Sequence, residues 1–372
     1  MIIGVQRERR PTEHRVSLTP AGVSMLTQRG HGVLVESGAG DEAGHSDADY
    51  ASAGATIVYA RSEAVGRPDL LLGVLAPGPA EYELLRPGQA VLAFWGLPAA
   101  HGEDLRRLCE REVTAVGIEA IADAHGHAPV LTSMSEIAGP LAVTLGAQLL
   151  LNEGGGKGIL LGGAPGVPPA NLVVLGAGVL GTAAARAAVG MGAEVLLVDK
   201  SVHQLRTAVE RIGRSVPTLL ATPPNLERTL AFADLTIASP AVRGAGAPLL
   251  VTREMLRAMK PRAVVMDLSI DMGGCLETSR PTAFPHPVYE VDGIRHFCVP
   301  NLPAIAARSA TLALTNALTP YLAAIAGEGV DAALREHPEL RRGVYLYRGR
   351  CVNESLAELF GLALETAGTP GT

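Results

Sequence analysis

The run VVLGAGVLGTAAARAAVGMGAEVLLVD, residues 173–199, constrains the fold of this chain more than any other part of it. Gly176, Gly178 and Gly181 have the spacing G-x-G-x-x-G, directly after a short apolar strand and directly before a helix. The first glycine permits a tight turn, the second lets a pyrophosphate approach the backbone, and the third lets helix and strand pack closely. A second strand ends at Asp199, whose carboxylate can accept both hydroxyls of a ribose. The run therefore predicts a dinucleotide-binding βαβ unit, with a nucleotide-free glycine-rich turn as the alternative.

The same run predicts which dinucleotide binds. A carboxylate at Asp199 repels the 2′-phosphate of NADP, so NAD is the expected cofactor. Lys200 follows directly and keeps NADP open as an alternative. The pyrophosphate would meet the positive end of the helix.

Composition and charge favour a small-molecule partner. The 372 residues include 31 Lys and Arg against 37 Asp and Glu, a formal charge of −6, which gives no basic footprint for nucleic acid or an anionic membrane. Residues 1–10 place their charges after the apolar stretch, the reverse of a secretory signal. The apolar segment 309–329 is interrupted by polar residues and Pro320, which predicts a buried helix. The four cysteines include no CxxC pair, so we expect a cytoplasmic protein without a metal site or disulfides.

Apolar strand-like runs alternate with helix-like segments in two series, which predicts an α/β protein with two Rossmann-like doubly wound domains. The first series comprises 2–5, 33–36, 70–76, 90–94 and 113–118. The second series comprises 171–178, 194–199, 218–221, 235–239, 263–267 and 296–299.

Two long apolar helices connect these series. One begins near Ser133, and the other lies near 305–326 and ends at Gly327. We expect residues 1–134 and 305–372 to form a substrate domain whose C-terminal tail is helix and loop. Residues 135–304 would form an inserted NAD-binding domain, with a cleft between the two domains.

Several motifs are similar to those of the alanine dehydrogenases and the related soluble NAD(P) transhydrogenase alpha subunits, from the first strand to near residue 320. They are EHRVSLTPAGV (13–23), MSEIAG (134–139), the glycine fingerprint, MKPRAVVMDLSIDMGGCLETSRPT (259–282) and VPNLPA (299–304). In that family a hydride passes between a nicotinamide and a 2-amino or 2-oxo acid. The resemblance therefore implies an NAD-dependent oxidoreductase, assembled as a homo-oligomer, either a hexamer or a dimer.

The resemblance also implies a set of cofactor-binding residues. They are Met134, Ser135, Gly176, Ala177, Gly178, Val179, Gly181, Asp199, Ser239, Leu268, Asp271 and Asn301. Asp271 could instead be a solvated loop acid or cap the turn that follows it, and Asn301 could be a turn residue.

The substrate side departs from the family pattern. Arg15 matches the family arginine that holds the substrate carboxylate, a role that suits a planar guanidinium, although a surface salt bridge is the alternative. The positions where the family keeps a lysine and a histidine hold Leu75 and Gly96, and Trp95 precedes the glycine. With Asn301 these residues predict a pocket that is larger, more apolar and less positive.

These replacements bear on the function. Arg15 and Asp271 remain as catalytic candidates, and a positioned acid or base typically contributes about 10²–10⁴ in rate. We therefore expect poor turnover of alanine unless another group substitutes, the candidates being Asp271, His14, Arg7 and Arg10. The sequence favours a diverged NAD-dependent oxidoreductase acting on an amino acid, amine, imine or oxo compound other than alanine or pyruvate. A true alanine dehydrogenase and a catalytically silent NAD-binding homologue are the alternatives.

Overall fold

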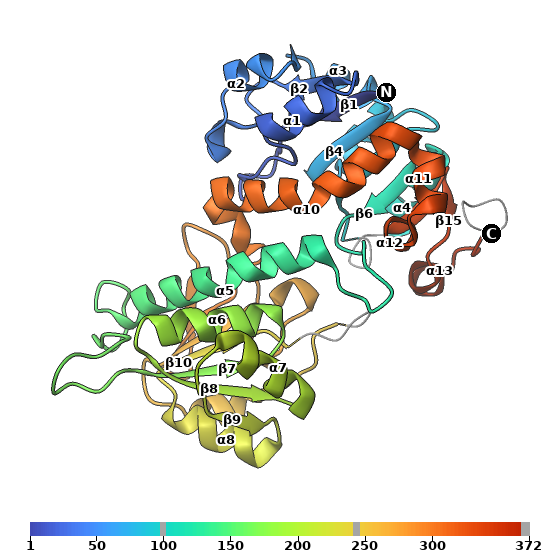
Figure 1. Ribbon diagram of the computed structural model, residues 1–372. Helices are drawn as coiled ribbons and strands as arrows, with labels where there is room; N and C mark the ends of the chain where they lie inside the picture. Colours follow the sequence, from blue (N-terminus) through green and yellow to red (C-terminus); the bar gives the residue numbers. More distant parts are fainter. Residues whose placement is uncertain (97–101, 241–245, 366–372) are drawn as a thin grey trace. The chain divides into compact units, whose positions relative to one another are not determined.

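The computed structural model describes residues 1–96, 102–240 and 246–365 (Figure 1). The chain divides into two compact α/β domains. The first comprises residues 1–134 and the segment that begins at Ala304, and the second comprises residues 135–303. The division lies one residue from the boundary expected at 304 and 305.

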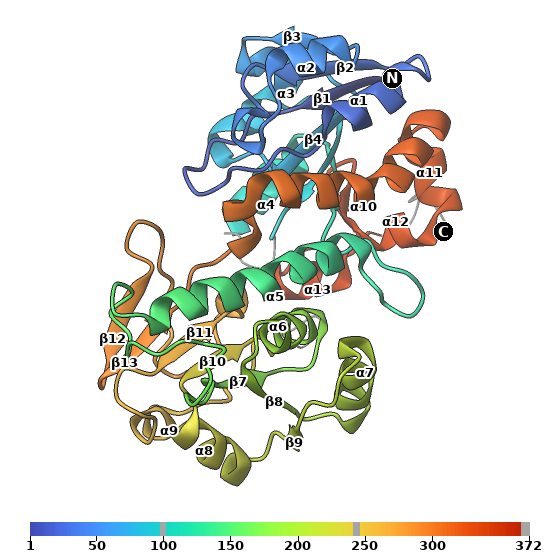
Figure 2. The ribbon, with the colours of Figure 1, turned by 60° about the vertical axis from the view of Figure 1, so that its left-hand side comes forward.

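The second domain is built on a seven-stranded sheet with the order β12-β13-β11-β10-β7-β8-β9, which Figure 2 shows. Six strands are parallel: β7 (Asn171–Leu175), β8 (Glu194–Asp199), β9 (Thr218–Leu220), β10 (Leu235–Ala238), β11 (Val264–Asp267) and β13 (Ile294–Phe297). In chain order they read 3-2-1-4-5-6, the arrangement of dinucleotide-binding domains, and the order reverses between β7 and β10. The edge strand β12 (Val288–Val291) pairs antiparallel with β13 and was not expected from the sequence.

Both faces of this sheet are covered. Successive strand residues point to opposite faces, so Leu172 and Val174 join one apolar cluster and Val173 and Leu175 the other. The first cluster includes residues of α5 (Pro129–Leu150), α6 (Val179–Gly190) and α7 (Val202–Ile212). The second includes residues of α8 (Pro223–Phe232) and α9 (Arg253–Arg257). Burial on two faces explains why the strands read as continuous apolar runs.

Helix α5 begins four residues before the predicted start at Ser133 and packs closely at two glycines. A Cβ atom at Gly139 would lie 2.6 Å from the main-chain nitrogen of Ala184, and one at Gly146 would lie 2.6 Å from Leu235 Cδ2. By length and composition, α5 and the helical segment Leu302–Glu328 could each cross a membrane. The close approach of α5 to α6 and β10 is the packing of a core helix.

The first domain has an eight-stranded sheet with the order β15-β14-β6-β5-β4-β1-β2-β3. Its parallel strands are β1 (Ile2–Val5), β2 (Gly32–Glu36), β3 (Thr56–Val58), β4 (Leu70–Leu75), β5 (Ala90–Phe94) and β6 (Thr114–Gly117). They again read 3-2-1-4-5-6, and here the order reverses between β1 and β4. The α-helices described in this domain are α1 (Pro20–Thr27), α2 (Asp47–Ser52), α3 (Arg61–Gly66), α4 (Gly102–Glu110), α10 (Ala307–Glu328), α11 (Val330–Glu336), α12 (Pro338–Arg342) and α13 (Glu354–Phe360).

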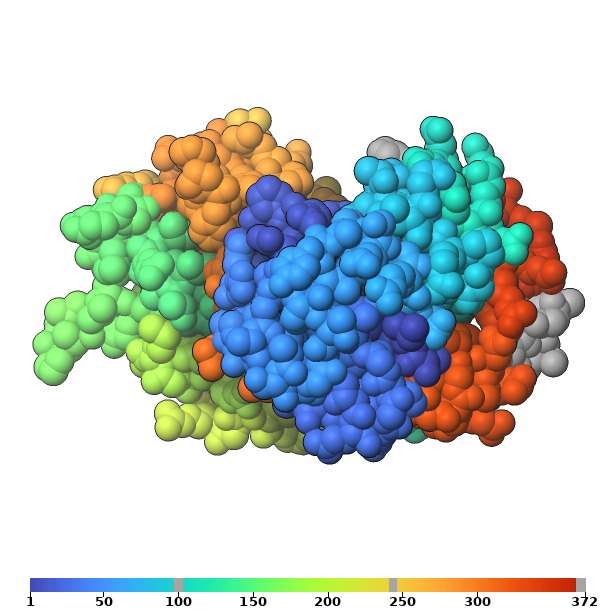
Figure 3. Space-filling model, turned by 90° about the horizontal axis from the view of Figure 1, so that it is seen from above, coloured from blue at the N-terminus to red at the C-terminus, as the bar shows by residue number. Residues whose placement is uncertain are grey.

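The C-terminal tail is not only helix and loop, as the sequence suggested. It contributes β14 (Val344–Tyr347) and β15 (Arg350–Cys351), and β14 pairs antiparallel with β6. In Figure 3, which shows only the surface, the red C-terminal residues lie beside teal residues of the first third of the chain. Tyr345 packs over Gly117, where a Cβ atom would lie 2.1 Å from the Tyr345 ring. Four residues are too few to show the alternating pattern of a strand, so the sequence did not reveal β14. Its partner, β6, also lies far away in the sequence.

Helix α10 anchors the start of the first domain. The hydroxyl oxygens of Thr311 and Thr315 accept hydrogen bonds from the main-chain nitrogens of Val16 (3.1 Å) and Thr19 (3.0 Å). The helix extends to Glu328, and the positive φ of +86° at Gly329, not Gly327, accompanies its end.

Asp234, next to the first residue of β10, ties three segments of the second domain together. Its Oδ1 accepts hydrogen bonds from Lys157 Nζ (2.8 Å) and Lys260 Nζ (3.0 Å). Its Oδ2 accepts from the main-chain nitrogen of Asn171 at 3.0 Å. Burial alone would raise the pKa of Asp234, but the hydrogen bonds from Lys157, Asn171 and Lys260 hold it at about 2, below the ordinary 3.8.

We predict that Asp234→Asn lowers the free energy of unfolding at pH 7 by about 1–2 kcal/mol, since it keeps the shape and removes the charge. The contribution of a depressed carboxyl pKa is present above pH 3.8 and is lost as the pH falls through about 2. Urea unfolding of both proteins at several pH values measures the difference. The exposed carboxylate variant Glu63→Gln is the control, and a difference that does not shrink in acid would contradict the prediction.

Candidate active site

Two of the three fingerprint glycines occupy positions where a side chain would not fit, and the third borders open space. Gly176 has a φ of +104°, and a Cβ atom there would lie 2.9 Å from the Ser239 carbonyl oxygen. At Gly181 a Cβ atom would lie 1.8 Å from the Gly176 oxygen, so helix and strand could not approach. At Gly178, the N-cap of α6, a Cβ atom would meet no atom of the described residues within 4 Å, and no side chain caps the helix. The turn therefore leaves open space at a helix N-terminus, which suits a pyrophosphate.

Asp199 lies at the carboxyl end of β8 beside this turn. Its Oδ2 accepts a hydrogen bond from the main-chain nitrogen of Ala177 (2.8 Å), and its Oδ1 accepts one from that of Ser201 (2.8 Å). Val179 begins α6 one residue after Gly178. The carboxylate is thus held next to the glycine turn, where a ribose would have to lie.

Ser239 and Leu268 follow the next two strands of the sheet. The Ser239 main-chain nitrogen donates to Leu175 O (2.8 Å), and that of Leu268 donates to Ala238 O (2.8 Å). The Ser239 hydroxyl is buried and has no hydrogen-bond partner among the described residues. Because buried polar groups are usually hydrogen-bonded, an orphan hydroxyl beside the fingerprint fits a site completed by a ligand.

Asp271 and Asn301, thirty residues apart, are brought together. Asp271 lies in a short 3₁₀ turn, Ile270–Met272, and its Oδ2 accepts a hydrogen bond from the Asn301 main-chain nitrogen (3.1 Å). Asn301 has a φ of +53°, a left-handed conformation that asparagine tolerates better than most residues. Asp271 therefore positions the Asn301 turn, and a role of either residue toward a ligand stays a prediction.

In the first domain Arg15 forms a buried ion pair and not a surface one. Its Nε and Nη2 donate to the two carboxylate oxygens of Glu13, each at 2.7 Å, and its Nη1 lies 3.2 Å from Met134 Sδ. The guanidinium lies over the Phe94 ring, 5.7 Å from its centroid. Ser135 is the next residue along α5. Glu13 thus fixes the orientation of the guanidinium, a role that sequence reasoning missed.

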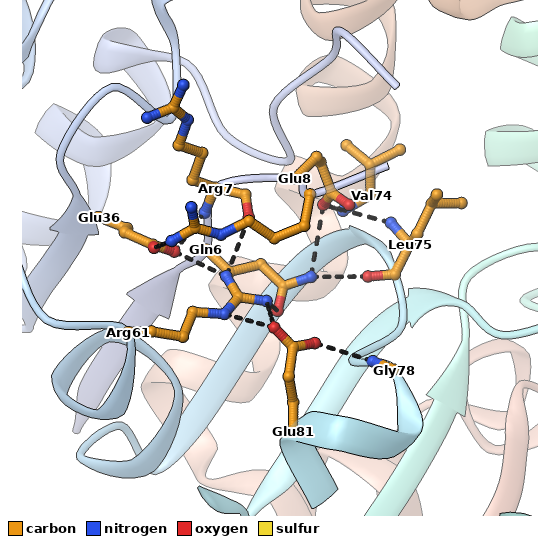
Figure 4. Close-up of polar contacts among 10 residues, drawn as sticks. Gln6, Arg7, Glu8, Glu36, Arg61, Val74, Leu75, Gly78 and Glu81 are labelled. Atoms are coloured by element: carbon orange, nitrogen blue, oxygen red, sulfur yellow. Dashed lines mark hydrogen bonds and ion pairs between the residues drawn. The ribbon is translucent and has the colours of Figure 1, made fainter. Parts of the chain in front are cut away.

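Glu8 was also missed, although it lies at the carboxyl ends of β1 and β4. Its Oε1 accepts hydrogen bonds from the main-chain nitrogens of Val74 (2.7 Å) and Leu75 (3.3 Å) and from Gln6 Nε2 (3.4 Å), as Figure 4 shows. Arg61 donates to Gln6 Oε1 (3.4 Å) and so orients the amide. Burial, followed by repulsion from Glu13, raises the pKa of Glu8 to about 7.

Trp95 and Gly96 lie at the end of β5. The indole is 8% exposed and packs in an apolar cluster with Tyr82, while its Nε1 is buried and has no hydrogen-bond partner among the described residues. The main-chain nitrogens of Trp95 and Gly96 donate to Glu119 Oε1, at 3.2 and 3.1 Å. Burial raises the pKa of Glu119. Gly96 has a φ of +54°, and a Cβ atom there would meet no described atom within 4 Å. The rest of the AFWGLPAA motif, residues 97–100, lies outside the described residues.

The side chains of the other suggested acid/base substitutes are partly or fully exposed. His14 Nδ1 pairs with Glu42, and both side chains are substantially exposed. Arg7 and Arg10 are exposed. Among the described residues, no group of three or more His, Cys, Asp or Glu side chains could hold a metal ion.

Glu8, Glu13 and Glu119 could have been found by one signal. All three follow strands of the parallel sheet in the sequence, and the carboxyl ends of such strands meet at one edge. Sequence reasoning followed basic and aromatic residues of the family motif and passed over these acids.

Two sheets of order 3-2-1-4-5-6, one carrying a complete glycine fingerprint, define a two-domain dinucleotide-binding α/β protein. Residues 4–138 match the family Alanine dehydrogenase/PNT, N-terminal domain, and residues 142–354 match Alanine dehydrogenase/PNT, C-terminal domain. The chain belongs to this family. NAD(H), the cofactor expected from the fingerprint, is the cofactor of the family.

The chain is also similar over almost its whole length to individual proteins of this family. The chain is 41% identical to an alanine dehydrogenase of Halomonas elongata over 362 residues, 97% of each chain. The structure of an L-alanine dehydrogenase, 38% identical, matches with a TM-score of 0.93 and covers 97% of this chain and 99% of that one. A transhydrogenase structure from Sinorhizobium meliloti, 27% identical, matches with a TM-score of 0.80 over 95% of this chain and all of that one.

We predict that the protein binds NADH roughly 10–100-fold more tightly than NADPH, because the Asp199 carboxylate repels a 2′-phosphate. Asp199→Asn keeps one acceptor for Ala177 N and should reduce the preference to within a few-fold. Calorimetric titration with each nucleotide measures it. Glu194→Gln, at the opposite end of β8, is the matched control. Equal affinities in the unmodified protein would remove the role assigned to Asp199.

Proposed function

We propose that this protein catalyses the alanine dehydrogenase reaction, in which L-alanine, NAD⁺ and water give pyruvate, ammonium and NADH. Its support is the identity of 41% with an alanine dehydrogenase over 97% of both chains. Such similarity favours this reaction over the diverged activity that the sequence alone suggested.

The residues of the chain fit the parts that the reaction needs. The glycine turn and Asp199 would hold NAD⁺, which accepts a hydride when it is bound. Arg15, fixed by Glu13, would hold the substrate carboxylate as a forked pair. Four free cysteines, Cys109, Cys275, Cys298 and Cys351, fit a reducing cytosol. We also propose that the protein assembles as a homo-oligomer, as the family resemblance implies.

A second candidate function rests on one observation, the space at Gly96. A Cβ atom there meets no described atom, and the family resemblance implies a histidine at this position and a lysine at Leu75. Without these two polar side chains the site would accept an amino or oxo acid with a longer apolar side chain. The reaction type would be the same, and the preferred substrate would differ.

The first test is turnover. We expect NADH oxidation, followed by absorbance, when the protein is mixed with pyruvate and ammonium, and NAD⁺ reduction with L-alanine. Reactions without ammonium are the control. A higher kcat/KM for longer 2-oxo acids than for pyruvate would favour the second candidate. Tight NADH binding with no turnover of any 2-oxo acid would contradict both and leave the catalytically silent homologue.

The second test fills the space at Gly96. We predict that Gly96→His lowers kcat/KM for longer 2-oxo acids about tenfold or more relative to pyruvate, because a filled pocket tolerates few added atoms. The positive φ of +54° adds a strain of about 1 kcal/mol. Gly88→His is the matched control, since Gly88 also has a positive φ (+78°) and open space around its Cβ position. Equal losses for both classes of substrate, or the same change in Gly88→His, would show that Gly96 does not line the pocket.

A further inference from the structure

Glu8 lies at the point where the strand order of the first domain reverses. It follows β1 by three residues, and its carboxyl group contacts the end of β4 through Val74 N and Leu75 N. Strands β1 and β4 are neighbours in the sheet, although two strands intervene in the sequence. Open α/β sheets bind their ligands at such a reversal, outside the carboxyl ends of the strands.

The donors around Glu8 distinguish its two oxygens. Val74 N, Leu75 N and Gln6 Nε2 all donate to Oε1. The Gln6 amide cannot turn without losing its bonds to Leu75 O (2.7 Å) and Arg61 (3.4 Å). No described residue hydrogen-bonds Oε2. This oxygen is also absent from the buried side-chain atoms of the described residues that lack a hydrogen-bond partner, so it is not fully buried. The proton that Glu8 gains or loses is therefore carried by Oε2.

Burial, followed by repulsion from Glu13, favours the protonated form of Glu8 near neutral pH. Glu13, the anion whose repulsion raises the pKa of Glu8, is paired with Arg15. Arg61 donates to Gln6, Glu36 and Glu81 and is not bonded to Glu8. From β4 only main-chain N–H groups reach the carboxyl. With a pKa of about 7, the group exists in both forms at the pH of a cytosol, which suits proton transfer in either direction.

We propose that Glu8 is the acid/base catalyst of this site and exchanges a proton with the substrate through Oε2. This inference rests on the proposed function. It assigns to Glu8 the proton transfer for which the family resemblance implies side chains at positions 75 and 96.

The step balances without any change in oxidation state at Glu8. Once hydride loss has left the substrate as an iminium ion, the Glu8 carboxylate takes a proton from water as the water oxygen bonds to the iminium carbon, which gives a neutral carbinolamine. Oε2 then returns this proton to the nitrogen, and as the C–N bond breaks and the C=O bond forms, the hydroxyl proton passes to the departing ammonia, which leaves as ammonium. In the reverse direction the protonated acid donates to the hydroxyl that departs as water.

A titration without turnover tests the proton on Oε2. Infrared spectra of the full-length protein should show a protonated-carboxyl band that disappears with a midpoint near pH 7. The band should be absent in Glu8→Gln and unchanged in Glu63→Gln, whose side chain is 45% exposed. If no band titrates between about pH 6 and 8, Glu8 holds no proton at neutral pH and the proposal is overturned.

The pH dependence of turnover tests the catalytic role. The log of kcat/KM for pyruvate should have a limb near pH 7 that is lost in Glu8→Gln, together with about 10²–10⁴ of kcat, while the Kd for NADH is unchanged. Glu8→Asp should recover part of the rate, since a carboxyl group remains. A Glu8→Gln variant with the unmodified rate and pH profile overturns the role of Glu8 and leaves the proposed function in place. An unmodified protein that turns over no 2-oxo acid removes the proposed function itself.

Discussion

Main-chain N–H groups at the carboxyl ends of parallel strands hold the carboxylates around which both domains are organised. In the second domain Asp199 accepts a hydrogen bond from Ala177 N. In the first domain Glu8 accepts hydrogen bonds from Val74 N and Leu75 N. These donors are available because a parallel sheet points its strand ends to one edge. Main-chain donors fix such a carboxyl group in position without an ion pair to a described residue, so the group stays available to a ligand.

The pKa of a carboxyl in this fold depends on whether a cation joins the main-chain donors. Asp234 has Lys157 and Lys260 at hydrogen-bonding distance, and its pKa is about 2. Glu8 has main-chain and amide donors and a neighbouring anion, and its pKa is about 7. Neutral donors offset the desolvation of Glu8 only in part, whereas two ammonium groups more than offset that of Asp234. The same type of side chain therefore stabilises one edge of a sheet and can carry a proton at another.

The glycine fingerprint, the two doubly wound domains and the buried helices could be predicted because their requirements are local. A positive φ at Gly176 or a close approach at Gly181 depends on residues a few positions away. The environment of Glu8 depends on β4, 66 residues further on, and no local pattern encodes that register. The pairing of β14 with β6 was missed for the same reason. Trp95 was expected in a pocket, and its aromatic character did not reveal how deeply β5 buries it.

The departures from the family that the resemblance implies at positions 75 and 96 are compatible with the proposed reaction. A lysine at position 75 would bring an ammonium group to the strand end at which the Leu75 nitrogen contacts Glu8, and an opposite charge lowers the pKa of a carboxyl. Leucine provides no such cation, so Glu8 keeps its proton up to neutral pH. Leucine in place of lysine at position 75 thus removes one polar side chain and leaves the Glu8 carboxyl group able to exchange a proton at the same sheet edge. With the proposed role of Glu8, replacement of the lysine and histidine that the family resemblance implies would not be equivalent to loss of catalysis.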